Sequence, residues 1–256
     1  MSLKTYLAKI PIIKRLYPSL FCYLCRIFNK KIFIKNFQGQ LFELNINEPI
    51  DKSIILFDKY ENKQIEFTLG IIKNNRINIF LDIGANSGIY SLLISSKFKK
   101  LKIFSFEPIK KTYDKLLKNI RLNKSLKNIK TYNYGASNKN SKQIMKALIK
   151  KNIIQYGGFG VSQTKKINKN FYTEEASFKK LDSIFNFKNK KIFIKIDTEG
   201  HENLLLDGIK KLIKNNDIHM QIEIWPNNYL KVKKKLTDFK LKEINNIESD
   251  FYFTKK

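Results

Sequence analysis

Cysteine is scarce in this sequence, and long apolar runs are missing. Two of the 256 residues are cysteine, which is too few for a disulfide scaffold and indicates a reducing compartment. No uncharged apolar run approaches the ~20 residues that a membrane-spanning helix needs. The run Leu16–Cys25 has ten residues, is bracketed by cations and precedes no small-residue cleavage site, so it is a poor signal peptide. We expect a cytoplasmic protein, with peripheral contact at the inner face of the membrane as the alternative.

Arginine is also rare. It supplies 4 of the 50 basic residues, although the formal net charge is +28. A charge of this size would suit a nucleic-acid binder. Proteins that read phosphates or bases tend to use arginine, because its planar guanidinium makes paired hydrogen bonds. A chain rich in Lys, Asn and Ile instead indicates coding bias in an A/T-rich genome, so the charge alone does not establish a nucleic-acid partner.

Acidic residues are missing from the N-terminal stretch, since none precedes Glu43. Residues 1–30 mix cations with apolar side chains, and Pro11 and Pro18 are expected to interrupt any helix there. The segment either packs on the domain as a helix or lies on an anionic membrane surface. Cys22 and Cys25 are expected to be core residues rather than metal ligands. With a β-hairpin predicted over 31–46, residues 1–50 form a basic arm.

The rest of the chain, residues 51–256, is predicted to be one α/β domain. Hydrophobic residues make up 43% of the sequence, which is ample for a core. Helical material is expected over 53–73, and residues 137–190 are expected to be irregular, as a lid-like insert. Strands and helices alternate elsewhere, which predicts a doubly wound, mostly parallel seven-stranded sheet with a closing hairpin. The expected strands are 77–84, 101–107, 128–136, 191–197, 218–225, 241–247 and 250–255; the expected helices are 87–98, one after Pro108, 201–215 and 227–238.

A glycine-containing loop follows the first of these strands. Gly84 and Gly88 allow the backbone to approach a ligand closely, Asn86 tolerates positive φ, and the loop leaves amide N–H groups for an anionic group. Glu107 ends the next strand, where an acid can accept hydrogen bonds from both hydroxyls of a ribose. The dinucleotide fingerprint is absent, and Asp82 suits an amine-bearing cofactor better than a pyrophosphate. The pattern therefore favours S-adenosylmethionine.

Four segments in this order make the sequence recognisable: FLDIGANSGIYSLL, FSFEP, IKIDTEGHENLLLDG and QIEIW. Together they resemble the FkbM family of class I methyltransferases, from about Tyr60 to the C-terminus. The resemblance implies a Rossmann-like, S-adenosylmethionine-dependent O-methyltransferase acting on a hydroxyl of a sugar, glycan or related metabolite, as in a bacterial glycan pathway. By the same resemblance, the cofactor is bound by Asp82, Gly84, Asn86, Ser87, Gly88 and Glu107, and the adenine is lined by Gly135, Ala136 and Ser137.

The fourth strand leads into Asp197-Thr198-Glu199-Gly200-His201, where catalytic groups are expected. A sugar hydroxyl benefits from a general base, and His201 is the first choice because its ordinary pKa is ~6.5. Asp197 or Glu199 could serve instead, or could orient His201. The two acids could also cap the following helix, and His201 could be a surface residue of that helix. The cluster could hold a divalent ion, but we expect no metal.

The acceptor is not identified by the sequence. The acid-free stretch 115–173 covers much of the insert, and its Lys, Asn and aromatic residues suit an anionic or carbohydrate acceptor; a solvated loop in a Lys-biased chain would look the same. Two alternatives stay open. A nucleic-acid (RNA) methyltransferase fits the charge, but the fourth strand lacks the Pro-Pro-aromatic and Pro-Cys segments of base methylation. The second alternative is a catalytically inactive protein that lies on a membrane surface. Oligomeric state is not predicted.

Overall fold

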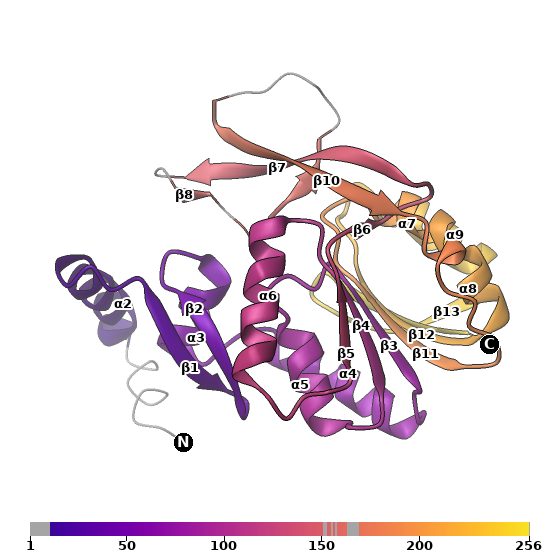
Figure 1. Ribbon diagram of the computed structural model, residues 1–256, viewed down its shortest axis with the longest axis horizontal. Coiled ribbons are helices and arrows are strands. Elements are labelled where there is room, and N and C mark those ends of the chain that lie inside the picture. The colour runs from indigo at the N-terminus through magenta and orange to yellow at the C-terminus, as the bar shows by residue number, and fades with distance from the viewer. Residues whose placement is uncertain (1–10, 151–152, 155, 157, 163–168, 256) are drawn as a thin grey trace. The chain divides into compact units, whose positions relative to one another are not determined.

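The computed structural model describes residues 11–150, 153–154, 156, 158–162 and 169–255 (Figure 1). The chain forms two compact units, residues 1–62 and 63–256. The domain boundary expected from the sequence lay at residue 50. The helix that follows it stays with the first unit, because the Lys35 ammonium donates hydrogen bonds to the Ile54 and Ile55 carbonyls at 2.6 and 3.1 Å.

The first unit is a helix, a hairpin and a second helix. Its elements are α2 (Pro11–Ile27), β1 (Ile32–Phe37), β2 (Gln40–Asn45) and α3 (Pro49–Phe57). The hairpin confirms the prediction over 31–46, with Phe37 paired to Gln40 across the turn. The expectation that prolines interrupt any helix here is wrong. Pro11 starts α2, where no N–H partner is needed, and the helix continues through Pro18 at the loss of one backbone hydrogen bond.

The second unit contains the expected seven-stranded sheet. Its strand order is β13-β14-β12-β11-β3-β4-β5, with β14 antiparallel to both neighbours and the remaining neighbours parallel. This confirms the doubly wound, mostly parallel α/β fold. The strands are β3 (Ile79–Ile83), β4 (Lys102–Phe106), β5 (Ile129–Tyr132), β11 (Lys191–Ile196), β12 (Asp217–Glu223), β13 (Leu241–Ile247) and β14 (Asp250–Lys255).

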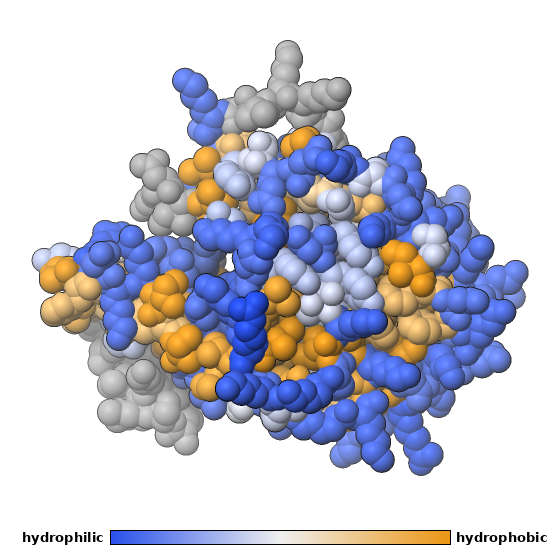
Figure 2. All heavy atoms as spheres, viewed as in Figure 1, coloured by the Kyte–Doolittle hydropathy of each residue, from blue (hydrophilic) through white to orange (hydrophobic). Residues whose placement is uncertain are grey.

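Helices cover both faces of this sheet. On one face, alternate β3 residues pack into an apolar cluster with Leu205 of α7 (Glu202–Gly208), Leu212 of α8 (Lys210–Asn215) and Val232 of α9 (Tyr229–Asp238). The other face carries α4 (Asn62–Asn74), α5 (Ile89–Lys97) and α6 (Lys110–Leu122). Figure 2 shows hydrophilic residues over much of the visible surface of this unit, with smaller hydrophobic groups between them.

The helix expected over 201–215 is instead two short helices, α7 and α8, separated at Ile209. Gly208, the last residue of α7, lies directly before the break. A Cβ at this position would lie 1.9 Å from the Ser137 carbonyl oxygen, so the chain passes too close to residue 137 for a side chain. The expected strand 128–136 is likewise divided, into β5 and the two-residue β6 (Gly135–Ala136).

The insert is a second β-sheet, so the prediction of an irregular segment over 137–190 is wrong. Its strands are β6, β7 (Ser141–Lys150), β8 (Ile153–Ile154), β9 (Gly160–Val161) and β10 (Phe171–Lys179). Met145 and Ala147 of β7 face Ala176 and Phe178 of β10 in a small separate core. Lys142, Lys146 and Lys150 obscured the β7 pattern in the sequence, and the pairing of β7 with β10 joins residues far apart in the chain.

Candidate active site

The loop after β3 has the backbone shape that the glycine spacing predicts. Gly84, Asn86 and Gly88 have φ values of +83°, +51° and +87°. A Cβ on Gly84 would lie 1.8 Å from the Asp197 carbonyl oxygen, and one on Gly88 would lie 2.3 Å from the Leu116 side chain. A side chain at Gly84 is therefore excluded by the backbone at the end of β11, and glycine at residue 88 is favoured by its positive φ.

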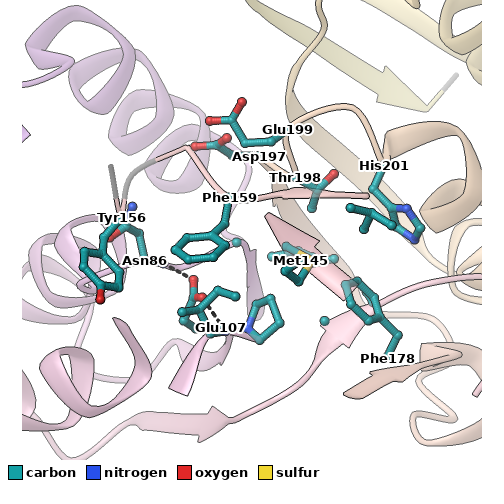
Figure 3. Close-up of a pocket in the computed structure, with 17 residues that line it drawn as sticks. Asn86, Glu107, Met145, Tyr156, Phe159, Phe178, Asp197, Thr198, Glu199 and His201 are labelled. Atoms are coloured by element: carbon teal, nitrogen blue, oxygen red, sulfur yellow. Dashed lines mark hydrogen bonds between the residues drawn. The ribbon is translucent and has the colours of Figure 1, made fainter. Parts of the chain in front are cut away.

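Glu107 lies beside this loop at the end of β4. Its carboxylate accepts backbone N–H groups from Asn86 at 3.0 Å and from Ile109 at 2.9 Å (Figure 3). The residue is 6% exposed, and burial raises the pKa of its carboxyl to about 8. Each oxygen has one backbone donor and retains capacity for a second. The arrangement suits a pair of ligand hydroxyls, such as those of a ribose.

One pocket brings most of the predicted site residues together. It contains about 580 Å³ of empty space, open solvent included. The predicted residues that line it are Gly84, Asn86, Glu107, Gly135, Ala136, Asp197, Glu199 and His201. Asp82, Ser87, Gly88 and Ser137 are not among the described residues that line it.

Asp82 lies beneath the pocket rather than in its wall. The residue is 1% exposed, and its Oδ2 accepts a hydrogen bond from Ser91 of α5, whose hydroxyl also bonds Ser105. Its Oδ1 has no hydrogen-bond partner among the described residues. Burial raises the pKa of the Asp82 carboxyl. The Asp82 carboxyl therefore joins the end of β3 to α5, the helix that follows the glycine loop.

Lys195 is a buried cation next to Asp82, and it is a site residue that was not predicted from the sequence. Its strand position pairs with that of Asp82, and its side chain is 4% exposed. The ammonium donates to Asp197 Oδ2 at 3.1 Å and lies 4.7 Å from the centre of the Tyr90 ring. A lysine in the middle of the apolar strand KIFIKI was the available signal, since a buried lysine almost always has a partner.

A third carboxyl, Glu223 at the end of β12, completes this cluster. It is hydrogen-bonded to Asp197 and accepts a hydrogen bond from the Ser249 hydroxyl at 2.9 Å. Burial, together with the Asp197 charge, raises the pKa of Glu223 to about 8. Burial would also raise the pKa of Asp197, but the Lys195 ammonium and the hydrogen bonds from Glu223 and Lys195 hold it below its usual value. Asp197 is therefore the ionised member of the pair.

Glu199 lies beside Asp197 on the pocket wall, and Figure 3 shows the two carboxyl groups on the same side. Burial, with the nearby Asp197 and Glu202 charges, raises the pKa of Glu199 to about 7. Its backbone has a φ of +50°, which is uncommon for a residue with a side chain. Such backbone strain is concentrated at functional sites in proteins.

His201 has a more enclosed setting than a surface position on α7 would give it. It is 5% exposed, its Nε2 is 2.9 Å from the Ser137 hydroxyl, and its ring lies 5.2 Å from that of Phe178. Burial lowers the pKa of His201 to about 4, so the ring is neutral at pH 7. Figure 3 shows it beside Phe178 and away from the carboxyl groups of Asp197 and Glu199.

The insert supplies the apolar part of the pocket wall. Met145, Phe159, Val161 and Phe178 line the pocket, together with Tyr156. The Lys111 ammonium lies 4.1 Å from the centre of the Tyr156 ring. A lid-like insert was expected from the sequence, but the places of Met145, Val161 and Phe178 in the pocket wall depend on the unexpected sheet. In the part of the chain that the structure describes, no three His, Cys, Asp or Glu side chains are arranged to hold a metal ion.

Comparison with known proteins gives one family match and several distant likenesses. The model of the Methyltransferase FkbM domain matches residues 82–247. Methyltransferase sdnD from Sordaria araneosa is 40% identical over 67 residues, which are 26% of this chain and 26% of that protein. The chain thus matches about a quarter of the length of this curated relative.

Two solved structures are similar at low sequence identity. Precorrin-6y C5,15-methyltransferase from Geobacter metallireducens has a TM-score of 0.45 and 13% identity, over 77% of this chain and 88% of the other. A SAM-dependent O-methyltransferase from Thermotoga maritima has a TM-score of 0.46 and 10% identity, over 80% of this chain and 70% of the other.

Proposed function

The chain belongs to the FkbM methyltransferase family, and from that premise we propose that it transfers a methyl group from S-adenosylmethionine to a hydroxyl of a sugar, glycan or related metabolite. S-adenosylmethionine is the cofactor of this family. The observation that carries the proposal is the pocket, which is lined by the glycine loop, Glu107 and Asp197 and by the apolar side chains of the insert. Methyl transfer to a hydroxyl oxygen and the choice of a carbohydrate acceptor are the proposed part.

The residues present fit this cofactor. Glu107 would accept hydrogen bonds from the two ribose hydroxyls, because both its oxygens retain acceptor capacity beside the pocket. Ile109, Met145 and Phe159 offer apolar contact for an adenine ring. Asp197 is an ionised carboxylate on the same wall, so it would attract the cationic amine of the cofactor. Asp82 would act indirectly, by joining β3 to α5.

When bound, the cofactor supplies an activated methyl group on a sulfonium, so the protein's work is to position the acceptor and remove its proton. We assign the role of general base to Glu199. A base works best when its pKa is near the working pH, and the pKa of Glu199 is raised to about 7. His201 has a pKa lowered to about 4 and bonds Ser137, so it would act as a positioning residue.

The insert supports a carbohydrate or anionic acceptor. Sugars stack on aromatic faces, and Tyr156, Phe159 and Phe178 line the pocket. The Lys111 ammonium lies against Tyr156, which lines the pocket. A cation at this position would attract a phosphate or carboxylate on the acceptor. The nucleic-acid alternative has the net charge of +28 as its one support.

Titration calorimetry with S-adenosylhomocysteine tests the cofactor site directly. We expect micromolar binding by the wild type and its loss in Glu107→Ala. The matched control is Glu66→Ala, since Glu66 is an exposed carboxyl on α4. A folded wild type that binds no S-adenosylhomocysteine would refute the cofactor assignment.

The acceptor needs a separate assay, namely formation of S-adenosylhomocysteine with panels of glycans, nucleotide sugars and RNA. We expect turnover with a hydroxyl-bearing carbohydrate and a loss of kcat, with little change in cofactor affinity, in Glu199→Gln. Turnover on RNA alone would overturn the choice of acceptor while leaving the cofactor site intact. Cofactor binding without turnover on any acceptor would favour the inactive alternative.

A further inference from the structure

Helix α2 carries an apolar stripe that its own unit leaves exposed. Leu16, Leu20, Tyr23, Leu24 and Ile27 are between 42% and 62% exposed, and Phe28 directly after the helix is 75% exposed. The first five are spaced by three and four residues, so they share one face of the helix. Figure 2 shows hydrophobic residues at the surface of this helix. Large apolar side chains gathered in this way mark an interaction surface.

The opposite face of α2 packs against the β1–β2 hairpin. Phe21 packs against Tyr17 on the helix at 5.9 Å between ring centres and against Phe33 of β1 at 5.8 Å. Cys25 on the same side is 8% exposed. The helix is therefore fixed to the hairpin by one face. The stripe is not needed for the packing of the first unit.

Cations border the stripe and no acid does. Arg26, Lys30 and Lys31 are exposed at the end of the helix, and Lys14 and Arg15 precede the stripe in the sequence. No Asp or Glu occurs in the first 42 residues. A surface that is apolar in the middle and cationic at the rim matches a negatively charged lipid surface, which offers acyl chains beneath anionic headgroups.

We propose that α2 lies in the plane of an anionic membrane surface, with its stripe in the headgroup–acyl boundary and its cations at the headgroups. A helix of 17 residues is about 25 Å long, which suits this orientation. No helix in the described ranges is both long and apolar enough to cross a bilayer. A second copy of the chain is a poorer occupant, because pairing two such helices would bring two cationic rims together. The inference does not depend on the proposed methyl transfer.

Vesicle co-sedimentation of the full chain tests the proposal. We expect binding to phosphatidylcholine vesicles that contain phosphatidylglycerol, weak binding to pure phosphatidylcholine, and loss of binding at high salt. The double variant Leu20→Glu/Ile27→Glu should reduce the partition coefficient about tenfold or more, since two apolar side chains no longer enter the interface. The control Ser125→Glu/Asn227→Glu adds the same charge at exposed positions of the second unit and should bind nearly as the wild type does.

A fluorescence measurement covers the case in which the double variant fails to fold. In a Trp225→Phe background, Tyr23→Trp puts the one tryptophan on the stripe, and its emission should shift to the blue with anionic vesicles. No shift and no co-sedimentation would overturn the proposal. Equal binding by the control and the stripe variant would also overturn it. So would a stable dimer that Leu20→Glu/Ile27→Glu dissociates, because a second copy would then cover the stripe.

Discussion

Glu107 is a carboxyl whose burial opposes the ionised form that ribose hydroxyls require. Its pKa is raised to about 8 in the free protein, and hydroxyls that donate to the carboxylate would lower it again. Binding below pH 8 must therefore release a proton. We expect the affinity for S-adenosylhomocysteine to weaken as the pH falls from about 8 to about 6, by up to about tenfold per unit, and to be level just above pH 8.

Calorimetry across this pH range, repeated in two buffers of different ionisation enthalpy, would measure both the affinity and the proton release. Glu107→Gln should bind more weakly and with a smaller pH dependence, since the remaining titration is that of Glu199 and Glu223. Glu66→Gln should behave as the wild type does. A wild-type affinity that is level between pH 6 and 8 would contradict the assignment of the proton to Glu107.

Lys195 is a second residue with a testable role, because its ammonium lowers the pKa of both Asp197 and Asp82. Lys195→Met would leave Asp197 and Asp82 without their cation, so the pKa of Asp197 should rise and the acid limb of the kcat/KM profile should move to higher pH. Removal of one member of a buried pair also costs about 3 kcal/mol of unfolding free energy. Urea unfolding and pH profiles measure these effects, with Lys191→Met as the exposed control on the same strand. Matching pH profiles for the two variants would show that Lys195 is structural only.

Some residues of the site could be predicted from the sequence, and others could not. Gly84, Glu107 and Asp197 follow predicted strands, so their place at one edge of the sheet could be deduced from the chain alone. Glu223 lies within the predicted strand 218–225, but the face to which its side chain points depends on the register of β12. Lys195 and Met145 are part of the site because of contacts between segments that are distant in the chain. A local sequence pattern does not predict such contacts. His201 was found, yet its burial against Ser137 and Phe178 could not be known.

At the scale of elements, the packing at the end of α7 requires a glycine, because Gly208 lies against the backbone of Ser137. Gly208→Ala would place a Cβ 1.9 Å from the Ser137 carbonyl oxygen, so helix and strand must separate. We expect a loss of about 2–3 kcal/mol in unfolding free energy, and weaker cofactor binding if Ser137 moves. Gly70→Ala is the matched control in α4, because nothing lies within 4 Å of its Cβ; it should stabilise the protein by about 0.5–1 kcal/mol. Chemical denaturation of both variants decides the matter, and equal stability would refute the close approach.

The strands and helices of the main sheet were predictable because each has a clear hydrophobic pattern and residues that mark its start or end. Strands β3, β4 and β11 are nearly continuous apolar runs, and Pro108 and the glycines mark where helices start. The insert was not predictable in this way. The alternation in Ser141–Lys150 is a β pattern, but its partner Phe171–Lys179 lies after a long connection, and the lysines on the exposed side hid the buried Met145 and Ala147.

At the scale of the whole molecule, the charge of +28 has a consequence whatever the acceptor is. We expect the protein to bind single-stranded RNA of any sequence at low salt, because lysines release counterions from phosphates. The logarithm of the binding constant should fall steeply with the logarithm of salt concentration, so binding should vanish by about 0.3 M salt. Fluorescence anisotropy with two unrelated RNAs tests this expectation. Sequence-selective binding that persists at that salt would restore the nucleic-acid alternative.

The insert leaves the domain and returns to it at neighbouring positions, because Gly135 pairs with Phe178 and Ala136 with Lys179. A segment whose ends already meet adds little closure entropy when its length or content changes. Residues 138–177 could therefore be exchanged as a unit while the glycine loop and Glu107 remain untouched, provided that apolar side chains replace Met145 and Phe159 beside the adenine. The residues of the insert that face the acceptor are then free to diversify without a change in the main sheet.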